Sequence, residues 1–185
     1  MGEWRRVNAA GYEYRHVRAA GVFANDRETY VQAVTALGPG YWVLTPLQLQ
    51  DGTTILVNRG FVPPQRRQPG MHGVLSTHEP AVVTGLLRMP EPKGAFLRRN
   101  DSAADRWFSR DIGAIARRRG LGRVAPYFID AAGLPAQTVG PVGGLTVTAF
   151  RNSHLAYAIT WYTLAVMAIG GAWIATRELE DVAEP

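Results

Sequence analysis

Residues 152–176 read NSHLAYAITWYTLAVMAIGGAWIAT and contain no Asp, Glu, Lys or Arg. As a helix, the 22 residues from Leu155 to Thr176 would rise about 33 Å, which is enough to cross a hydrocarbon core of ~30 Å. The sequence therefore predicts a membrane-spanning helix at this position. His154 stands at its entrance, where an imidazole at the membrane interface is able to hold a ligand.

One face of this predicted helix carries two rings followed by small side chains. His154 and Trp161 lie seven residues apart, and the face continues with alanines at positions 158, 165, 168 and 172. A stripe of small residues is typical of a second helix packing closely. It also leaves room for a planar macrocycle, since a neutral imidazole can ligate haem iron and an indole can border the ring. The residues alone leave both interpretations of His154 open, a helix anchor or an iron ligand.

Charge divides the chain into three predicted parts. Residues 1–151 carry 19 basic and 11 acidic side chains, and they are long enough for one domain with its own core. Residues 152–176 form the transmembrane helix, and residues 177–185 form a tail with four acids and one arginine. The basic residues are scattered, so we expect no nucleic-acid partner and regard the lipid bilayer as the anionic surface nearby. The absence of cysteine excludes disulfides, thiolate metal sites and a cysteine nucleophile.

The domain is rich in predicted strands. Two β-prone runs, 41–49 and 53–62, are joined around Asp51-Gly52, which favours a tight hairpin. Ser109 is expected to cap a helix over 110–119 that ends at Gly120. Further strands are expected at 12–23, 28–34, 81–87, 127–130 and 145–150. The predicted fold is α+β, an antiparallel, β-rich, barrel-like domain with one inserted helix, followed by a C-terminal transmembrane helix.

The sequence lacks the common catalytic signatures, including the zinc-protease, serine-hydrolase and phosphate-loop motifs. We therefore expect a protein that is not an enzyme. Arg59 interrupts an apolar run and should find a carboxylate or backbone partner, and we favour such a structural role over binding. His72 and His78 read as surface histidines, and Asn100-Asp101-Ser102 matches a glycosylation acceptor, a pattern that is frequent by chance.

Three blocks of sequence together resemble a known family. The hairpin block is GYWVLTPL at 40–47, Asp51-Gly52 and ILVNRGFVP at 55–63, and the middle block is Asn100 with RWFSRD at 106–111. The third block is NSHLAYAITWY at 152–162. In this order they resemble the Surfeit locus protein 1 family, the cytochrome c oxidase assembly factors.

The resemblance implies a membrane protein that helps to build the haem a centres of cytochrome oxidase. It implies a domain on the outer side of the bacterial cell membrane, or at the mitochondrial inner membrane, held by a helix at each end. The first of these helices would precede Tyr12, and no such apolar stretch is present in residues 1–11.

Bacterial members of the family are regarded as haem a binders. The resemblance therefore implies that His154 is a haem iron ligand and that Trp161 is a wall of the haem pocket. The implied partners are the large subunit of cytochrome c oxidase, which would receive haem a, and a haem a synthase. The alternative is a scaffold that stabilises the nascent subunit without carrying haem.

Overall fold

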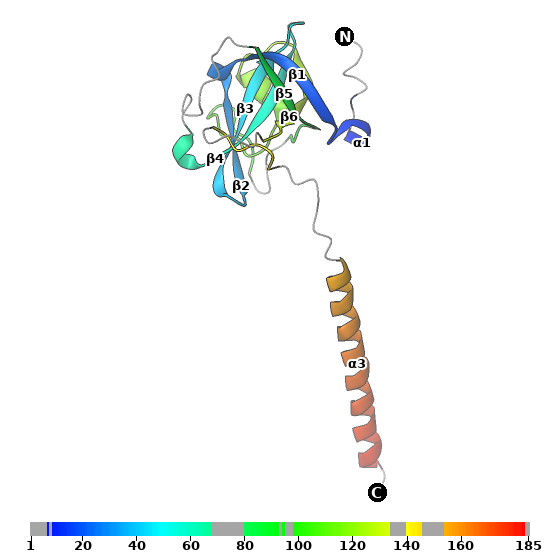
Figure 1. Cartoon of the computed structure of the whole chain (residues 1–185). Coiled ribbons are helices and arrows are strands. Elements are labelled where there is room, and N and C mark those ends of the chain that lie inside the picture. Colours follow the sequence, from blue (N-terminus) through cyan, green and yellow to red (C-terminus); the bar gives the residue numbers. More distant parts are fainter. Residues whose placement is uncertain are drawn as a thin grey trace. The chain divides into compact units, whose positions relative to one another are not determined.

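The computed structural model forms two units, which divide between Thr146 and Val147. Figure 1 shows a small β domain in the first unit and one long helix in the second. We describe each unit by itself. The described residues are 7, 9–67, 80–92, 94, 98–133, 140–145 and 154–183.

Six strands and four short helical elements make up the described part of the first unit (Figure 1). The strands are β1 (His16–Phe23), β2 (Thr29–Thr35), β3 (Gly38–Gln48), β4 (Thr54–Val62), β5 (Pro80–Arg88) and β6 (Val124–Ala131). The α-helices are α1 (Ala9–Tyr12) and α2 (Ile112–Arg118), and the 3-10 turns are η2 (Asn25–Arg27) and η3 (Pro64–Arg66).

Five of the strands close into a barrel. The order around it is β1-β5-β6-β4-β3, and β3 returns to β1 through the pairs Val22↔Gln48 and Phe23↔Leu47. All of these pairings are antiparallel except that of β4 with β6. The edge strand β2 pairs with the other half of β3. The predicted antiparallel, barrel-like fold is thereby confirmed.

The predicted hairpin is confirmed as β3 and β4. Gly52 adopts a φ of 76°, a left-handed conformation that glycine reaches without steric cost. The Leu49 N–H donates to the Thr53 carbonyl at 2.8 Å, and the Asp51 carboxylate accepts the Thr53 N–H at 2.9 Å. Each residue of the Asp-Gly turn therefore stabilises the reversal of the chain.

The apolar core has two layers because β4 is covered on both faces. One layer joins strands across the barrel and comprises Phe23, Leu47, Ile55, Val57, Val83, Ala125 and Ile129. The other lies under α2 and comprises Val31, Leu44, Leu56, Trp107, Ile112, Ile115 and Phe128. A strand buried on both faces needs consecutive apolar residues, which explains the unbroken Ile55-Leu56-Val57 run.

Several expected element boundaries are wrong, and two of them have a clear local cause. The strand expected from Tyr12 begins only at His16, because 9–12 form α1 and Tyr14 takes a φ of 64°. The inserted helix begins at Ile112 and is capped by Asp111, whose side chain accepts the Ala114 N–H at 3.0 Å. A carboxylate is as good a cap as a hydroxyl, and Ser109 is occupied elsewhere. The strand expected at 145–150 lies almost wholly outside the described residues.

The second unit consists of α3 (His154–Ala183). Among the described residues it is the helix that is long and apolar enough to cross a membrane, over Tyr157–Ile174. This confirms the predicted C-terminal helix. The helix also continues past the expected boundary at Thr176 into the acidic segment.

Candidate functional site

The helix face that carries His154 and Trp161 lies at the start of α3. His154 is the first residue of the helix and is exposed, and Trp161 is 66% exposed. Seven residues make nearly two turns, so the indole follows the imidazole on the same face, about 10 Å along the axis. Ala158 lies between them. The face therefore combines one imidazole with a flat apolar surface.

Between Leu155 and Ile174, large apolar side chains are exposed on every side of α3. Its large exposed side chains are Leu155, Tyr157, Ile159, Trp161, Tyr162, Leu164, Val166, Met167, Ile169, Trp173 and Ile174, each at least 50% exposed. A helix that is hydrophobic all round is stable only when a protein core or a bilayer covers it. In the described structure none of the membrane-length window is buried, so a bilayer is the environment that its composition fits.

The face of α3 meets the chemical requirements of haem only in part. Imidazole is a common axial ligand of haem iron, and alanines leave space for an apolar macrocycle. A single helix covers one side of such a ring, however, so the other side must be covered by lipid or by another protein segment. No group of three His, Asp or Glu side chains suited to a metal ion is present among the residues described here.

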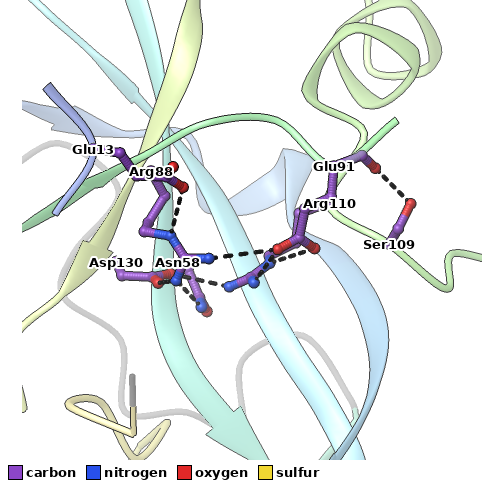
Figure 2. A network of polar contacts seen from close by, with 7 residues as sticks. All are labelled: Glu13, Asn58, Arg88, Glu91, Ser109, Arg110 and Asp130. Carbon is purple, nitrogen blue, oxygen red and sulfur yellow. Dashed lines mark hydrogen bonds and ion pairs between the residues drawn. The ribbon is translucent and has the colours of Figure 1, made fainter. Parts of the chain in front are cut away.

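The barrel contains a second polar arrangement, centred on the buried Asp130 of β6 (Figure 2). Asn58, its register partner on β4, donates from Nδ2 to Oδ1 of Asp130 at 2.8 Å. Two guanidinium groups also contact this carboxylate: Arg110 Nη1 lies 3.4 Å from Oδ1, and Arg88 Nη1 lies 3.2 Å from Oδ2. The Asp130 side chain is only 3% exposed, so these contacts replace its lost hydration.

Both arginines reach a second carboxylate, as Figure 2 shows. Arg88 Nε donates to Glu13 at 3.4 Å, and Arg110 Nε donates to Glu91 Oε2 at 3.1 Å, with a further bond from Arg110 Nη2 to Glu91 Oε1. The network thereby joins β4, β5 and β6 to the segment before β1 and to the loop that leads into α2. Because every charge in it faces an opposite charge, its geometry supports a structural clamp.

Glu91 makes the stability that this network contributes dependent on pH. Burial alone would raise the pKa of the Glu91 carboxyl, but hydrogen bonds and charge from Arg110, with the charge of Arg88, hold that pKa below its usual value of 4.5. A lowered folded-state pKa contributes stability that is complete above the unfolded pKa and is lost as the pH falls through the folded value. No motif in the sequence indicates this role.

Replacing Glu91 by Gln is therefore expected to flatten the acid limb of the stability curve. At pH 7 the variant should unfold at a lower temperature than the parent, and the difference should shrink as the pH falls below about 4.5. Thermal unfolding of the full chain in detergent, followed by near-ultraviolet circular dichroism, measures this. Asp26→Asn, which removes a 75% exposed carboxylate, is the control, and a pH-independent difference would contradict the role of Glu91.

The expected partner of Arg59 is present. Arg59 Nη1 donates to Glu28 Oε1 at 3.2 Å and to the Asn25 side chain at 3.3 Å, and Glu28 also accepts the hydroxyl of Thr45 at 3.1 Å. The Arg59 and Glu28 side chains are 11% and 5% exposed, which confirms a buried and satisfied arginine. Gly60, which follows Arg59, has a positive φ of 128°, a conformation that favours glycine.

The middle sequence block also consists of residues with internal contacts. Asn100 Oδ1 accepts the N–H groups of Phe108 and Ser109, and Ser109 Oγ donates to the Glu91 carbonyl at 2.7 Å. The glycosylation pattern at Asn100 is thus explained by a loop-ordering amide whose Nδ2 donates to Ser109. Trp107, also in this block, is buried in the core under α2.

The main polar cluster of the barrel consists of residues that the sequence did not single out. The structure brings together Asp130, Arg88, Glu91 and Arg110, which come from separate parts of the chain and carry no recognisable spacing. His72 and His78, predicted to be surface histidines, lie outside the described residues. His154 and Trp161 share a helix face as the spacing predicts, while their proposed ligand stays a prediction.

Comparison with known proteins supplies the family. A family model described as the SURF1 family matches residues 2–166. Surfeit locus protein 1 of Rattus norvegicus is 36% identical over 173 residues, covering 82% of this chain and 54% of the rat protein. The Homo sapiens protein of the same name is 34% identical over 170 residues, covering 83% and 56%. A SURF1-like protein of Monosiga brevicollis is 32% identical over 184 residues, covering 92% and 69%. The chain spans about half the length of the rat and human proteins.

Proposed function

Because the chain belongs to the SURF1 family, we propose that it is a membrane-anchored assembly factor for cytochrome c oxidase. The observation that carries the proposal is the extent of the family match, which runs through the barrel and into the first half of α3. The apolar surface of α3 supports anchoring in a bilayer. The protein would act by binding and delivery, without catalysing a reaction.

We further propose that haem a is the cargo and that His154 ligates its iron. The position of His154 just before the apolar window Tyr157–Ile174 favours this, because an interfacial imidazole is hydrated enough to exchange a ligand and close enough to lipid to receive an apolar macrocycle. Trp161 would border the ring on its deeper side. Release to the large oxidase subunit would then require only that the iron exchange one nitrogen ligand for another.

The same proposal places the partners at a membrane. The large subunit of cytochrome c oxidase would receive the haem, and a haem a synthase would supply it. The barrel would lie on the outer side of a bacterial cell membrane, the mitochondrial inner membrane being the alternative. Cells that lack the protein should contain a catalytically poor oxidase with a reduced haem a content.

Replacing His154 by Ala is expected to lower the haem that copurifies with the chain by at least about tenfold, since even outer-shell changes at metal sites cost 10- to 100-fold in affinity. The measurement is the Soret absorbance of detergent-purified protein from cells that make haem a. His16→Ala, which changes an exposed histidine of β1, is the matched control and should retain its haem.

Two other outcomes would change the proposal. Equal haem in His154→Ala and His16→Ala would remove His154 as the ligand. A parent protein without a Soret band that still restores oxidase activity to deficient cells would favour the scaffold function, in which the barrel stabilises the nascent subunit.

A further inference from the structure

The hairpin between β2 and β3 ends in an exposed apolar tip. Val34 is 86% exposed and Leu37 is 57% exposed. The sequence from residue 29 to residue 50 contains no charged side chain, so the hairpin itself places no charge at this tip. Exposed apolar side chains gathered at one site mark a contact with a membrane or with another protein.

Two arginines lie on the surface beside this tip. A groove of about 420 Å³ is lined by Val34, Pro39, Tyr41, Pro64, Arg98 and Phe108, among others, which places Val34 of the tip and Arg98 on one surface. Among the described residues that line it, none is acidic. Arg67 lies over the Tyr41 ring at 4.8 Å, and Arg98 lies over the Phe108 ring at 5.4 Å.

This combination fits an anionic lipid surface. Apolar side chains enter the boundary between headgroups and acyl chains, an aromatic ring such as that of Tyr41 suits the interfacial layer, and arginines attract anionic headgroups. The same chain carries α3, so a bilayer is within reach of the barrel once α3 is inserted. A protein partner would need both an apolar pocket for the tip and acids for the arginines, whereas the bilayer that the apolar surface of α3 fits supplies both kinds of group.

We propose that the β2–β3 tip, defined by Val34 and Leu37 with Arg67 and Arg98 nearby, docks on the anionic surface of the bilayer. Docking would fix the orientation of the barrel against the membrane and limit the directions from which a partner approaches. The inference rests on the membrane anchoring in the proposed function, but it does not depend on haem.

The absence of native cysteine permits a direct test. Leu37→Cys is labelled with an environment-sensitive dye, and the full chain is reconstituted into vesicles of phosphatidylcholine alone or of phosphatidylcholine with phosphatidylglycerol. We expect a blue shift of the dye emission and quenching by spin-labelled lipids, both stronger with phosphatidylglycerol. Val82→Cys, at a 54% exposed apolar position on β5, is the matched control and should stay in water.

The arginines give a second readout. Arg67→Gln and Arg98→Gln should each lower the ratio of immersed to free tip by about fivefold, the equivalent of ~1 kcal/mol per basic residue near the surface. High salt should have the same effect as these substitutions.

Vesicle flotation of the same samples separates this inference from anchoring. A chain that floats while the Leu37 dye stays in water in both lipid mixtures overturns the docking surface and leaves anchoring intact. A dye shift that occurs in detergent and grows with protein concentration identifies a second copy as the occupant, and overturns the inference. A chain that does not float overturns the anchoring and the inference together.

Discussion

Replacing Asp130 by Asn is expected to destabilise the barrel by about 3–5 kcal/mol, the cost of removing one partner from a buried ion pair. The amide keeps the shape of the carboxylate but removes the charge between Arg88 and Arg110, whose side chains are 13% and 14% exposed. The amide also replaces one acceptor oxygen by an NH₂ group, which is itself a donor and would face the N–H donors around it. Domains are stable by only about 5–15 kcal/mol, so the loss is a large fraction of the total.

Denaturant unfolding of the full chain in detergent, followed by tryptophan fluorescence, measures this loss. The exposed Asp26→Asn is the control and should change the free energy of unfolding by less than about 0.5 kcal/mol. If Asp130 acts through its arginines, adding Arg110→Gln to Asp130→Asn should cost less than the sum of the two single changes. Additive effects, or an Asp130→Asn variant as stable as the control, would contradict the network.

Replacing Trp107 by Ala is expected to cost about 3–5 kcal/mol, the range for a large aromatic side chain in a core. Trp107 is 1% exposed and packs between the strands and α2, beside Ile112, Ile115 and Phe128. Its Nε1–H donates to the Asp105 carboxylate at 2.8 Å, so the substitution also leaves that acceptor without this donor. The Trp107 carbonyl accepts the N–H of Gln32, which attaches the loop to the edge of β2.

Trp107→Phe is an intermediate test, because it keeps a buried aromatic ring but loses the N–H donor together with the five-membered part of the indole. It should cost less than Trp107→Ala, about 1–3 kcal/mol, through the lost indole volume and hydrogen bond, because the 38% exposed Asp105 keeps Arg119 Nη2 as a donor at 2.8 Å. Trp161→Ala, which changes a 66% exposed ring on α3, is the control and should leave barrel unfolding unchanged. The role of Trp107 in the core would be refuted if Trp107→Ala unfolded at the same denaturant concentration as this control.

The sequence predicts the elements whose signals are local. The hairpin follows from Asp51-Gly52 between two β-prone runs, and the membrane-length helix follows from an uncharged stretch after 151. Both depend on side chains within a few residues of one another. The start of the inserted helix was wrong because Ser109 and Asp111 are equally good caps locally. The choice between them depends on the contacts of Ser109 with Glu91 and Asn100, which are distant in sequence.

The sequence predicts that Arg59 needs an acceptor, but it does not predict which residue supplies it. A guanidinium within an apolar run requires an acceptor, but nothing in the spacing singles out Glu28, which is 31 residues away. Likewise, the shared face of His154 and Trp161 follows from helical periodicity alone. What binds that face depends on groups beyond the helix itself.

The sequence alone therefore determined a strand-rich domain, one tight hairpin and a helix of membrane length, because periodicity and turn chemistry act between neighbouring residues. The tertiary structure decided the closure of β3 onto β1 and the clamp around Asp130. The clamp depends on Asn58 and Arg88, which are 72 and 42 residues from Asp130. Those residues meet only because the strand order places β4, β5 and β6 side by side, and the hydrophobic core that sets this order is a property of the whole domain.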